Sequence, residues 1–175
     1  PVVLPIPRHF EPAPAKLALN AAGVSVTTDG AAMSVIGADL LKKRLASLAG
    51  DVKTPNPPEG VSVAVEVVTG DRPEKLQSLP AALRPTESQG YVIHYDPAMR
   101  RFLLAGRDGA GAIYACVTLA QLFNVENGRL TLWPAQVRDW PDYKIRCMTD
   151  MRQVVPHEAD PALRRTPAWQ AKAVA

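Results

Sequence analysis

The sequence predicts an α+β fold in which one mixed β-sheet carries two α-helices on one face. Apolar residues recur at intervals of three and four over 32–48 and again over 112–123, which is the spacing of a helix face. Between these segments, short runs rich in β-branched residues alternate with small or polar ones, as in half-buried strands. The order strand, helix, strand, hairpin, helix, strand suits a single sheet with both helices on the same side.

The first half of the chain is expected to hold a Pro-rich arm, two short strands and one long helix. Residues 1–14 alternate proline with apolar residues and should run extended along a surface. Two β-prone segments follow at 17–19 and 24–28. Gly50 would end the helix as its C-cap, whereas Gly37 inside the pattern favours a helix start near Ala38. The apolar face of this helix comprises Met33, Ile36, Leu40, Leu41, Leu45 and Leu48.

The second half is expected to alternate strands with a second helix. A strand over 61–68 precedes an irregular stretch with a short helical turn near 74–79. Strands at 91–95 and 101–105 should form a hairpin, and a glycine-rich turn with Asp108 as N-cap should open the second helix. Further strand character follows at 130–133 and 135–137. The second helix face comprises Ile113, Val117, Ala120 and Phe123, and Gln121 on this helix is placed to tie a loop.

Composition describes a globular chain and excludes several kinds of partner. The 175 residues are 47% hydrophobic and 21% charged, with a net charge of +3, which suits one soluble domain. The densest basic run, Lys42-Lys43-Arg44, is expected on a solvated helix face, and no nucleic-acid partner is predicted. No window is apolar over the roughly 18 residues needed to cross a bilayer, so no membrane partner is predicted either. Cys116 and Cys147 are expected to be small buried hydrophobes.

The glycine cluster Gly106, Gly109 and Gly111 admits two interpretations. It follows a strand and opens a helix, where backbone amides can bind a phosphate group. Its spacing is G-x-x-G-x-G, however, which is not the dinucleotide-binding pattern. A tight turn with close helix–sheet packing is the favoured interpretation.

Other candidate chemistry is sparse. His9, His94 and His157 lie far apart in the sequence and lack the spacing of a metal site, so neither a metal nor a cofactor is predicted. Asp139, Asp142 and Asp150 could supply the two carboxyl groups that a glycosidase places across a sugar. Solvated or capping acids are the favoured interpretation of these three residues.

The segment from Glu87 to Arg146 carries an ordered set of motifs. They are Glu87 with Tyr91, the turn from Ala105 to Gly111, Thr118-Leu-Ala-Gln121, and Arg138-Asp-Trp-Pro141. In this order they resemble the small domain that precedes the (β/α)₈ barrel in family-20 glycoside hydrolases and related hexosaminidases. The Pro-rich start of the chain also looks like the arm of that domain, so the resemblance covers roughly residues 1–148.

The resemblance implies an accessory domain over 1–148 without catalytic residues. The family's catalytic acids lie in the barrel, which takes about 250 residues. Residues 149–175 are therefore expected to be the start of a missing barrel or a loosely packed tail, and the chain a fragment or a solitary domain. Arg146 matches the family's sugar-contacting arginine, although Cys147 replaces the usual glycine after it. The family also implies an extracytoplasmic (periplasmic or secreted) location.

The predicted function is to buttress the catalytic barrel of a β-N-acetylhexosaminidase-like enzyme. Trp133, Trp140 and Tyr143 are the predicted interface residues, and the partner is that barrel or a second copy of the chain, with an N-acetylhexosamine-containing glycan as a further candidate ligand. The alternative is a free-standing carbohydrate- or protein-binding module. Flat, exposed aromatic residues would favour the module, whereas two acids facing each other in a deep cleft would favour an enzyme.

Overall fold

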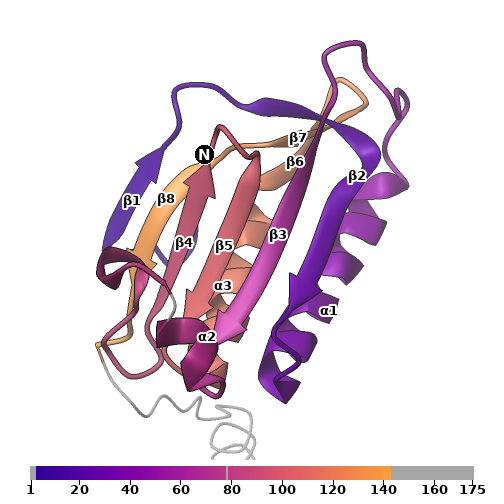
Figure 1. The fold of residues 1–175 in the computed structure, drawn as a ribbon. Coiled ribbons are helices and arrows are strands. Elements are labelled where there is room, and N and C mark those ends of the chain that lie inside the picture. The colour runs from indigo at the N-terminus through magenta and orange to yellow at the C-terminus, as the bar shows by residue number, and fades with distance from the viewer. Residues whose placement is uncertain (1–2, 78, 143–175) are drawn as a thin grey trace, which may run out of the picture. The chain divides into compact units, whose positions relative to one another are not determined.

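Eight strands form one sheet in the computed structural model, which describes residues 3–77 and 79–142 (Figure 1). The strands are β1 His9–Pro12, β2 Leu17–Thr28, β3 Val61–Thr69, β4 Tyr91–Asp96, β5 Arg101–Gly106, β6 Phe123–Glu126, β7 Arg129–Leu132 and β8 Ala135–Asp139. The helices are α1 Ala32–Ala49, α2 Pro73–Gln77 and α3 Gly109–Gln121, with a 3₁₀ turn at Ala81–Leu83.

The strand order is β1-β8-β4-β5-β3-β2-β7-β6. Strands β2, β3 and β5 pair in parallel, and the remaining neighbours are antiparallel, so the sheet is mixed. Helices α1 and α3 pack against each other and both lie behind the sheet in Figure 1, while the short α2 lies in front. The predicted α+β fold with two helices on one face is confirmed.

Strand β2 is one long element, so the prediction of two separate strands at 17–19 and 24–28 is wrong. Its first residues pair with β7 (Leu17 opposite Leu132), and its last residues pair with β3 (Val24 opposite Val63). The register on β3 shifts between Leu19 and Val24. This irregularity, which holds the polar residue Asn20, interrupts the alternation that a single strand shows in the sequence.

Both helix boundaries also differ from the sequence prediction. Helix α1 begins at Ala32, not near Ala38, and includes Gly37 without a break; it ends at Ala49, with Gly50 as the expected C-cap. Helix α3 begins directly after the predicted N-cap Asp108 but ends at Gln121. Phe123, expected on the helix, is the first residue of β6 and is buried.

The core lies between the helices and the sheet. It is built from alternate residues of β3 and β5, among them Val65, Val67 and Phe102, which face Leu41 and Leu119 of the helices. A smaller cluster of Val68, Leu76 and Ala105 lies under α2. Strands β3 and β5 are therefore apolar on both faces where α2 covers them.

The N-terminal residues are more closely attached than an extended surface arm. Val3 and Pro7 are buried, and His9–Pro12 pairs with β8 as an edge strand. Pro12 can lie in this strand because an edge strand needs backbone hydrogen-bond donors on one side only. None of the described helices is long and apolar enough to cross a membrane.

Candidate functional site

The helix layer presents aliphatic side chains on the side that faces away from the sheet. Ile36 and Leu40 of α1 and Val117 of α3 are 42–48% exposed. Side chains that are two residues apart in a helix point in directions that differ by about 200°. A residue two places from a buried one therefore projects from nearly the opposite side of the helix. Ile36 and Leu40 flank the buried Ala38 in this way, and Val117 lies midway between the buried Ala115 and Leu119. We call Ile36, Leu40 and Val117 the helix face.

The two helices hold these side chains level with each other. A Cβ atom added at Gly109 would lie 2.5 Å from Met33 Cγ, and one at Gly37 would lie 3.3 Å from Ile113 Cα. Four residues further along each helix, Val117 therefore lies level with Leu41, next to Leu40. Small side chains make the contact between the helices, and we expect the aliphatic groups on the outer sides of α1 and α3 to lie next to each other.

The sequence predicted these aliphatic residues as the buried faces of the helices, and for Ile36, Leu40 and Val117 this is wrong. Besides Leu41, Leu48 and Leu119, the buried sides of the helices use small residues, namely Ser34, Gly37, Ala38, Ala112, Ala115 and Cys116. Small residues allow the two helices to approach closely at Gly37, but they contribute little to a hydrophobic pattern. A helix that is apolar on two sides is usually buried on both, which identifies the outer side as a candidate interface.

The predicted interface aromatics engage other parts of the same domain. Trp133 is half-buried, and its indole Nε1–H donates to the carbonyl of Ala13 at 3.0 Å. The Trp140 ring packs under the guanidinium of Arg8, 4.8 Å from the ring centroid, and near the His9 ring. Their contact with a partner stays a prediction, and Tyr143 and Arg146 lie outside the described residues.

The acidic residues do not face each other across a cleft in the described part of the chain. Asp139 accepts from the Arg8 backbone amide at 3.2 Å and from the Tyr91 hydroxyl at 3.4 Å. Asp142 forms an ion pair with the Arg8 side chain. Asp150 lies outside the described residues. The carboxylates of Asp139 and Asp142 therefore act as structural acceptors, which does not favour catalysis by this pair.

The glycine-rich turn before α3 is filled by the protein itself. The Asp108 carboxylate accepts from the Gly111 amide at 3.0 Å and from the Gln89 amide at 2.8 Å. A Cβ atom at Gly106 would lie 2.2 Å from the Ala112 nitrogen. The structure thus supports the tight-turn interpretation, because Asp108 takes the place that a phosphate group would need.

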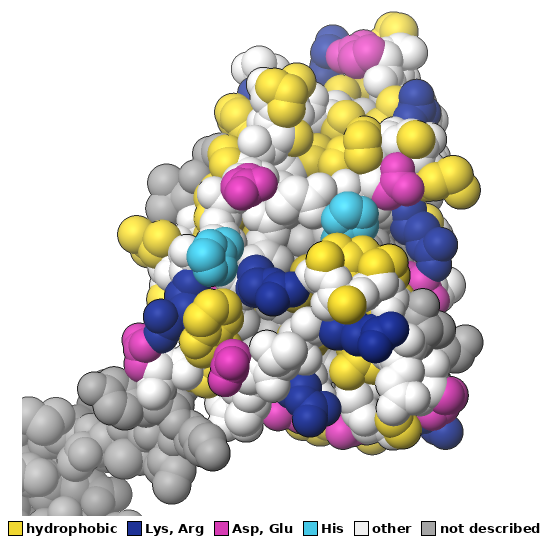
Figure 2. Space-filling model, turned by 60° about the vertical axis from the view of Figure 1, so that its left-hand side comes forward, with side chains coloured by type: hydrophobic (Ala, Val, Ile, Leu, Met, Phe, Trp, Pro, Cys, Tyr) yellow, Lys and Arg dark blue, Asp and Glu magenta, His cyan; other side chains and the backbone are white. Residues whose placement is uncertain are grey.

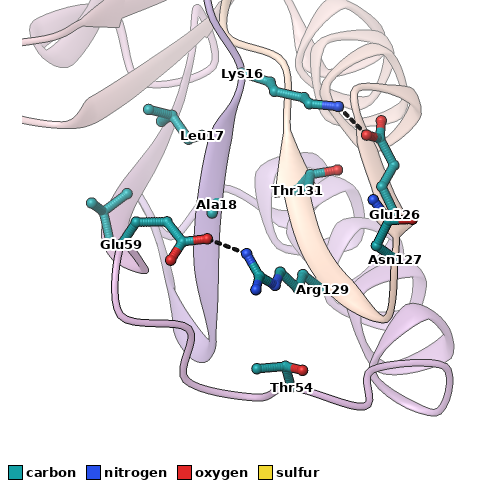
Figure 3. A pocket seen from close by; sticks show the side chains of 10 residues that line it. Lys16, Leu17, Ala18, Thr54, Glu59, Glu126, Asn127, Arg129 and Thr131 are labelled. Atoms are coloured by element: carbon teal, nitrogen blue, oxygen red, sulfur yellow. Dashed lines mark hydrogen bonds and ion pairs between the residues drawn. The ribbon is translucent and has the colours of Figure 1, made fainter.

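An open groove of about 610 Å³ lies along β2 and β7 (Figure 3). Two ion pairs cross it, Lys16 with Glu126 and Arg129 with Glu59, above the small residues Ala18 and Thr131. The charges neutralise one another, so the groove has no excess of one sign. Its lining comes from Lys16, Leu17, Ala18, Thr54, Glu59, Val61, Glu126, Asn127, Arg129 and Thr131. No sequence motif marks this groove, because the paired residues lie 110 and 70 positions apart.

Buried titratable groups in the described part are structural. Burial raises the pKa of the Cys116 thiol to about 12, so the thiol is neutral and unreactive near neutral pH. Burial also raises the pKa of Tyr91, whose hydroxyl lies 2.7 Å from Thr118 Oγ1. Within residues 3–77 and 79–142, no group of three histidine, cysteine or acidic residues is placed to hold a metal ion.

The surface around β1 shows no concentration of one charge sign. Figure 2 shows basic, acidic and histidine side chains interspersed on this side of the molecule. The predicted basic run, Lys42-Lys43-Arg44, is exposed on α1. All the large hydrophobic side chains that are exposed in the described part are aliphatic or methionine: Leu4, Ile6, Val35, Ile36, Leu40, Met99 and Val117. Stacking platforms for sugars use aromatic rings, so this surface does not favour such a platform.

Comparison with known families gives one match, and it covers most of the chain. Residues 1–140 match Glycosyl hydrolase family 20, domain 2. A comparison with curated proteins finds no match.

Several solved structures share the fold. Flavobacterium johnsoniae chitobiase aligns with a TM-score of 0.56 and 14% identity over 87% of this chain. A β-N-acetylhexosaminidase from Bacteroides fragilis aligns with a TM-score of 0.51 and 21% identity over 80% of this chain. CpGH84B aligns with a TM-score of 0.54 and 18% identity over 83% of this chain. The aligned part covers only 22%, 24% and 23% of those chains, respectively, so this chain corresponds to a small part of each.

Proposed function

The chain belongs to Glycosyl hydrolase family 20, domain 2, and on this premise we propose that it supports the catalytic domain of a β-N-acetylhexosaminidase-like enzyme. It does so without catalytic residues of its own. The observation that carries the proposal is the helix face, where Ile36, Leu40 and Val117 project away from a sheet that the helices already cover on their other side. The catalytic domain is the occupant that we propose for this face.

The size of the matched proteins supports this assignment. The chain aligns with less than a quarter of each solved relative, so the remaining part can supply a large partner surface. Full burial of an aliphatic side chain stabilises by about 1.5–3 kcal/mol. Ile36, Leu40 and Val117 are already about half covered, so docking would gain roughly half that amount for each.

The first test is hydrolysis of a chromogenic N-acetylglucosaminide by the 175-residue chain, beside a longer protein that joins it to its catalytic domain. We expect turnover by the longer protein and none by the chain alone, because the described acids serve as structural acceptors. Turnover by the chain alone would overturn the proposal and direct attention to Asp139, Asp142, Arg146 and Asp150.

A second test places a charge on the helix face of the longer protein. Leu40→Lys and Val117→Lys should lower the melting temperature of the catalytic domain and its activity, because a docked lysine must be desolvated. Both positions are exposed in the chain itself, so the same variants should leave the melting temperature of the 175-residue chain nearly unchanged. Met99→Lys, at another exposed apolar position, is the matched control. Equal effects of all three variants in the longer protein would count against docking through the helices.

Three further assignments stay predictions. Arg146 as a sugar contact, a glycan as ligand and an extracytoplasmic location rest on the family alone. A free-standing binding module is the alternative function, but it lacks support from an exposed aromatic ring in residues 3–77 and 79–142. A second copy of the chain on the helix face would appear as a dimer in size-exclusion chromatography, and Leu40→Lys should dissociate it.

A further inference from the structure

The first described residues, 3–8, are fastened to the domain at two points. We call them the N-terminal arm. At its start, the Leu4 amide donates to Gln121 Oε1 at 2.9 Å, and Gln121 Nε2 donates back to the Leu4 carbonyl at 3.1 Å. Gln121 is the last residue of α3, so this pair ties the arm to the helix, as the sequence predicted for Gln121. Val3 and Pro7 are buried on either side of this pair and fix the arm further.

At its other end, the arm holds the end of β8 through one side chain. Arg8 Nε donates to the Trp140 carbonyl at 3.2 Å, and the guanidinium lies over the Trp140 ring. The same guanidinium forms the ion pair with Asp142. The Arg8 backbone amide donates to Asp139, which also accepts from Tyr91. Arg8 thus contacts three of the last four described residues.

These contacts matter because strand pairing stops at Asp139. This residue pairs with Tyr91 of β4, and Arg138 pairs with His9 of β1, but residues 140–142 lie beyond the strand. Any direction imposed on this segment therefore has to come from side chains. Arg8 supplies a hydrogen bond to the Trp140 carbonyl, a contact with the Trp140 ring and an ion pair with Asp142, and this combination fixes orientation better than one exposed ion pair does.

We infer that the N-terminal arm is a clasp on the point where the chain leaves the sheet, with Arg8 as its positioning residue. Gln121 anchors the clasp on α3, and Arg8 closes it over Trp140 and Asp142. The clasp sets the path of the chain at residues 140–142. Its consequence for activity rests on the proposed function, since an exit held in place orients the domain relative to the catalytic domain that follows.

The clasp is tested in the 175-residue chain through the fluorescence of Trp140. The chain has three tryptophans, so Trp133→Phe and Trp169→Phe leave Trp140 as the single reporter. In this background, Arg8→Ala should raise the population of molecules in which residues 140–142 are detached from Arg8 and the arm. We expect an increase of about two- to fivefold, the change that corresponds to the loss of one exposed cation–π contact. Acrylamide quenching of Trp140 should rise with it, and Arg8→Lys should restore part of the protection.

Arg101→Ala is the matched control, because Arg101 is also an exposed arginine in an ion pair, with Glu66 of the sheet. It should leave the quenching of Trp140 unchanged. Equal quenching in Arg8→Ala and Arg101→Ala would overturn the clasp. A loss of overall stability is detected separately by urea unfolding, so an unfolded variant is not mistaken for an opened clasp.

The consequence for activity is tested by hydrolysis in the longer protein. Arg8→Ala should lower kcat, with partial recovery in Arg8→Lys and no change in Arg101→Ala. If Leu40→Lys lowers activity and Arg8→Ala does not, the consequence that we infer for activity is wrong and the proposed function stands. If neither variant changes activity, the proposed function itself is wrong, and the Trp140 measurement alone decides whether the clasp exists.

Discussion

Asp108 is the residue on which the start of α3 depends. Its carboxylate caps the helix at Gly111 and also holds the Gln89 amide of the preceding loop. Asp108→Ala should lower the free energy of unfolding by about 1–2 kcal/mol, because a capping acceptor and a loop contact are lost together. Urea unfolding measures this, with Asp39→Ala as control. Asp39 is exposed and forms a long ion pair with Lys42, at 3.9 Å, so its loss should cost less than about 0.5 kcal/mol. Equal losses in both variants would contradict the capping role.

Cys116 makes the stability of the fold depend on pH in the alkaline range. The thiol ionises near its ordinary pKa of 9.0 in the unfolded chain, and burial raises its pKa to about 12 in the fold. Between these values the unfolded chain binds fewer protons than the fold, so the contribution of the neutral thiol is complete below pH 9 and is lost as pH rises. The raised pKa of Tyr91 acts in the same direction, from pH 10.0 upward.

The corresponding measurement is urea unfolding at about pH 8 and about pH 10.5. Cys116→Ala should lose less stability between these two pH values than the unchanged chain, although it is less stable at both. Tyr91 is present in both proteins, so the difference isolates the thiol. An identical decline in the two proteins would show that Cys116 does not contribute.

The sequence identified residues where the chemistry is local. Asp108 was found because a capping acid lies directly before a helical pattern, and Gln121 because the motif Thr118-Leu-Ala-Gln121 lies on the same predicted helix. The partner of Asp108 at Gln89 lies 19 positions away, and the Arg8 contacts span more than 130 positions. These pairs form only once the sheet has assembled: the pairing of β4 with β5 brings Gln89 to Asp108, and the pairing of β1 with β8 brings Arg8 to Asp139 and Trp140.

The contact between α1 and α3 is the main constraint at the scale of elements. A Cβ atom at Gly37 would lie 3.0 Å from Cys116 Sγ and 3.3 Å from Ile113 Cα, so the helices touch there through backbone and small groups. Gly37→Val should separate them and lower the free energy of unfolding by about 1–3 kcal/mol, although valine favours a helix more than glycine does.

Ala46→Val is the matched control for that substitution. Ala46 is exposed on the same helix, so the change should cost only the difference in helix propensity, roughly 0.5 kcal/mol. Thermal unfolding of both variants measures the contrast. If the Gly37→Val variant is as stable as the unchanged chain, the helices can move apart without a loss of folding stability, and the predicted constraint is wrong.

Elements were predicted where their pattern was regular and missed where packing broke it. The hairpin of β4 and β5 and the strand β3 were predicted closely. Within the predicted faces of α1 and α3, Leu41 and Leu48 are buried, but Ile36, Leu40 and Val117 are exposed. Periodicity weights large apolar residues, whereas glycine, alanine and cysteine also fill the buried sides of these helices. Strand β1 was missed because it has only four residues and pairs with β8 near the other end of the described chain. Strand β6 was missed because its first residue, Phe123, was assigned to the second helix, although β6 and β7 form a hairpin across Asn127 and Gly128.

At the scale of the whole molecule, the fold class was predictable because it depends only on the order of elements. The groove over β2 and β7 was not, because its walls come from the start of the chain, the loop before β3 and the β6–β7 hairpin. The ion pairs across it are exposed, so they should contribute little to stability. The helix face also depends on how the elements pack. Ile36, Leu40 and Val117 are exposed because the small residues of α1 and α3 occupy the buried sides of these helices.

Docking through the helix face is the central claim, and thiol labelling tests it most directly. Single cysteines at Leu40→Cys or Val117→Cys, with Met99→Cys as reference, are placed in a Cys147→Ser background; the buried Cys116 stays unreactive. Positions 40 and 117 should react freely in the 175-residue chain and at least about tenfold more slowly in the longer protein, while position 99 reacts equally in both. Equal reactivity of positions 40 and 117 in the two proteins would show that the catalytic domain does not cover the helix face.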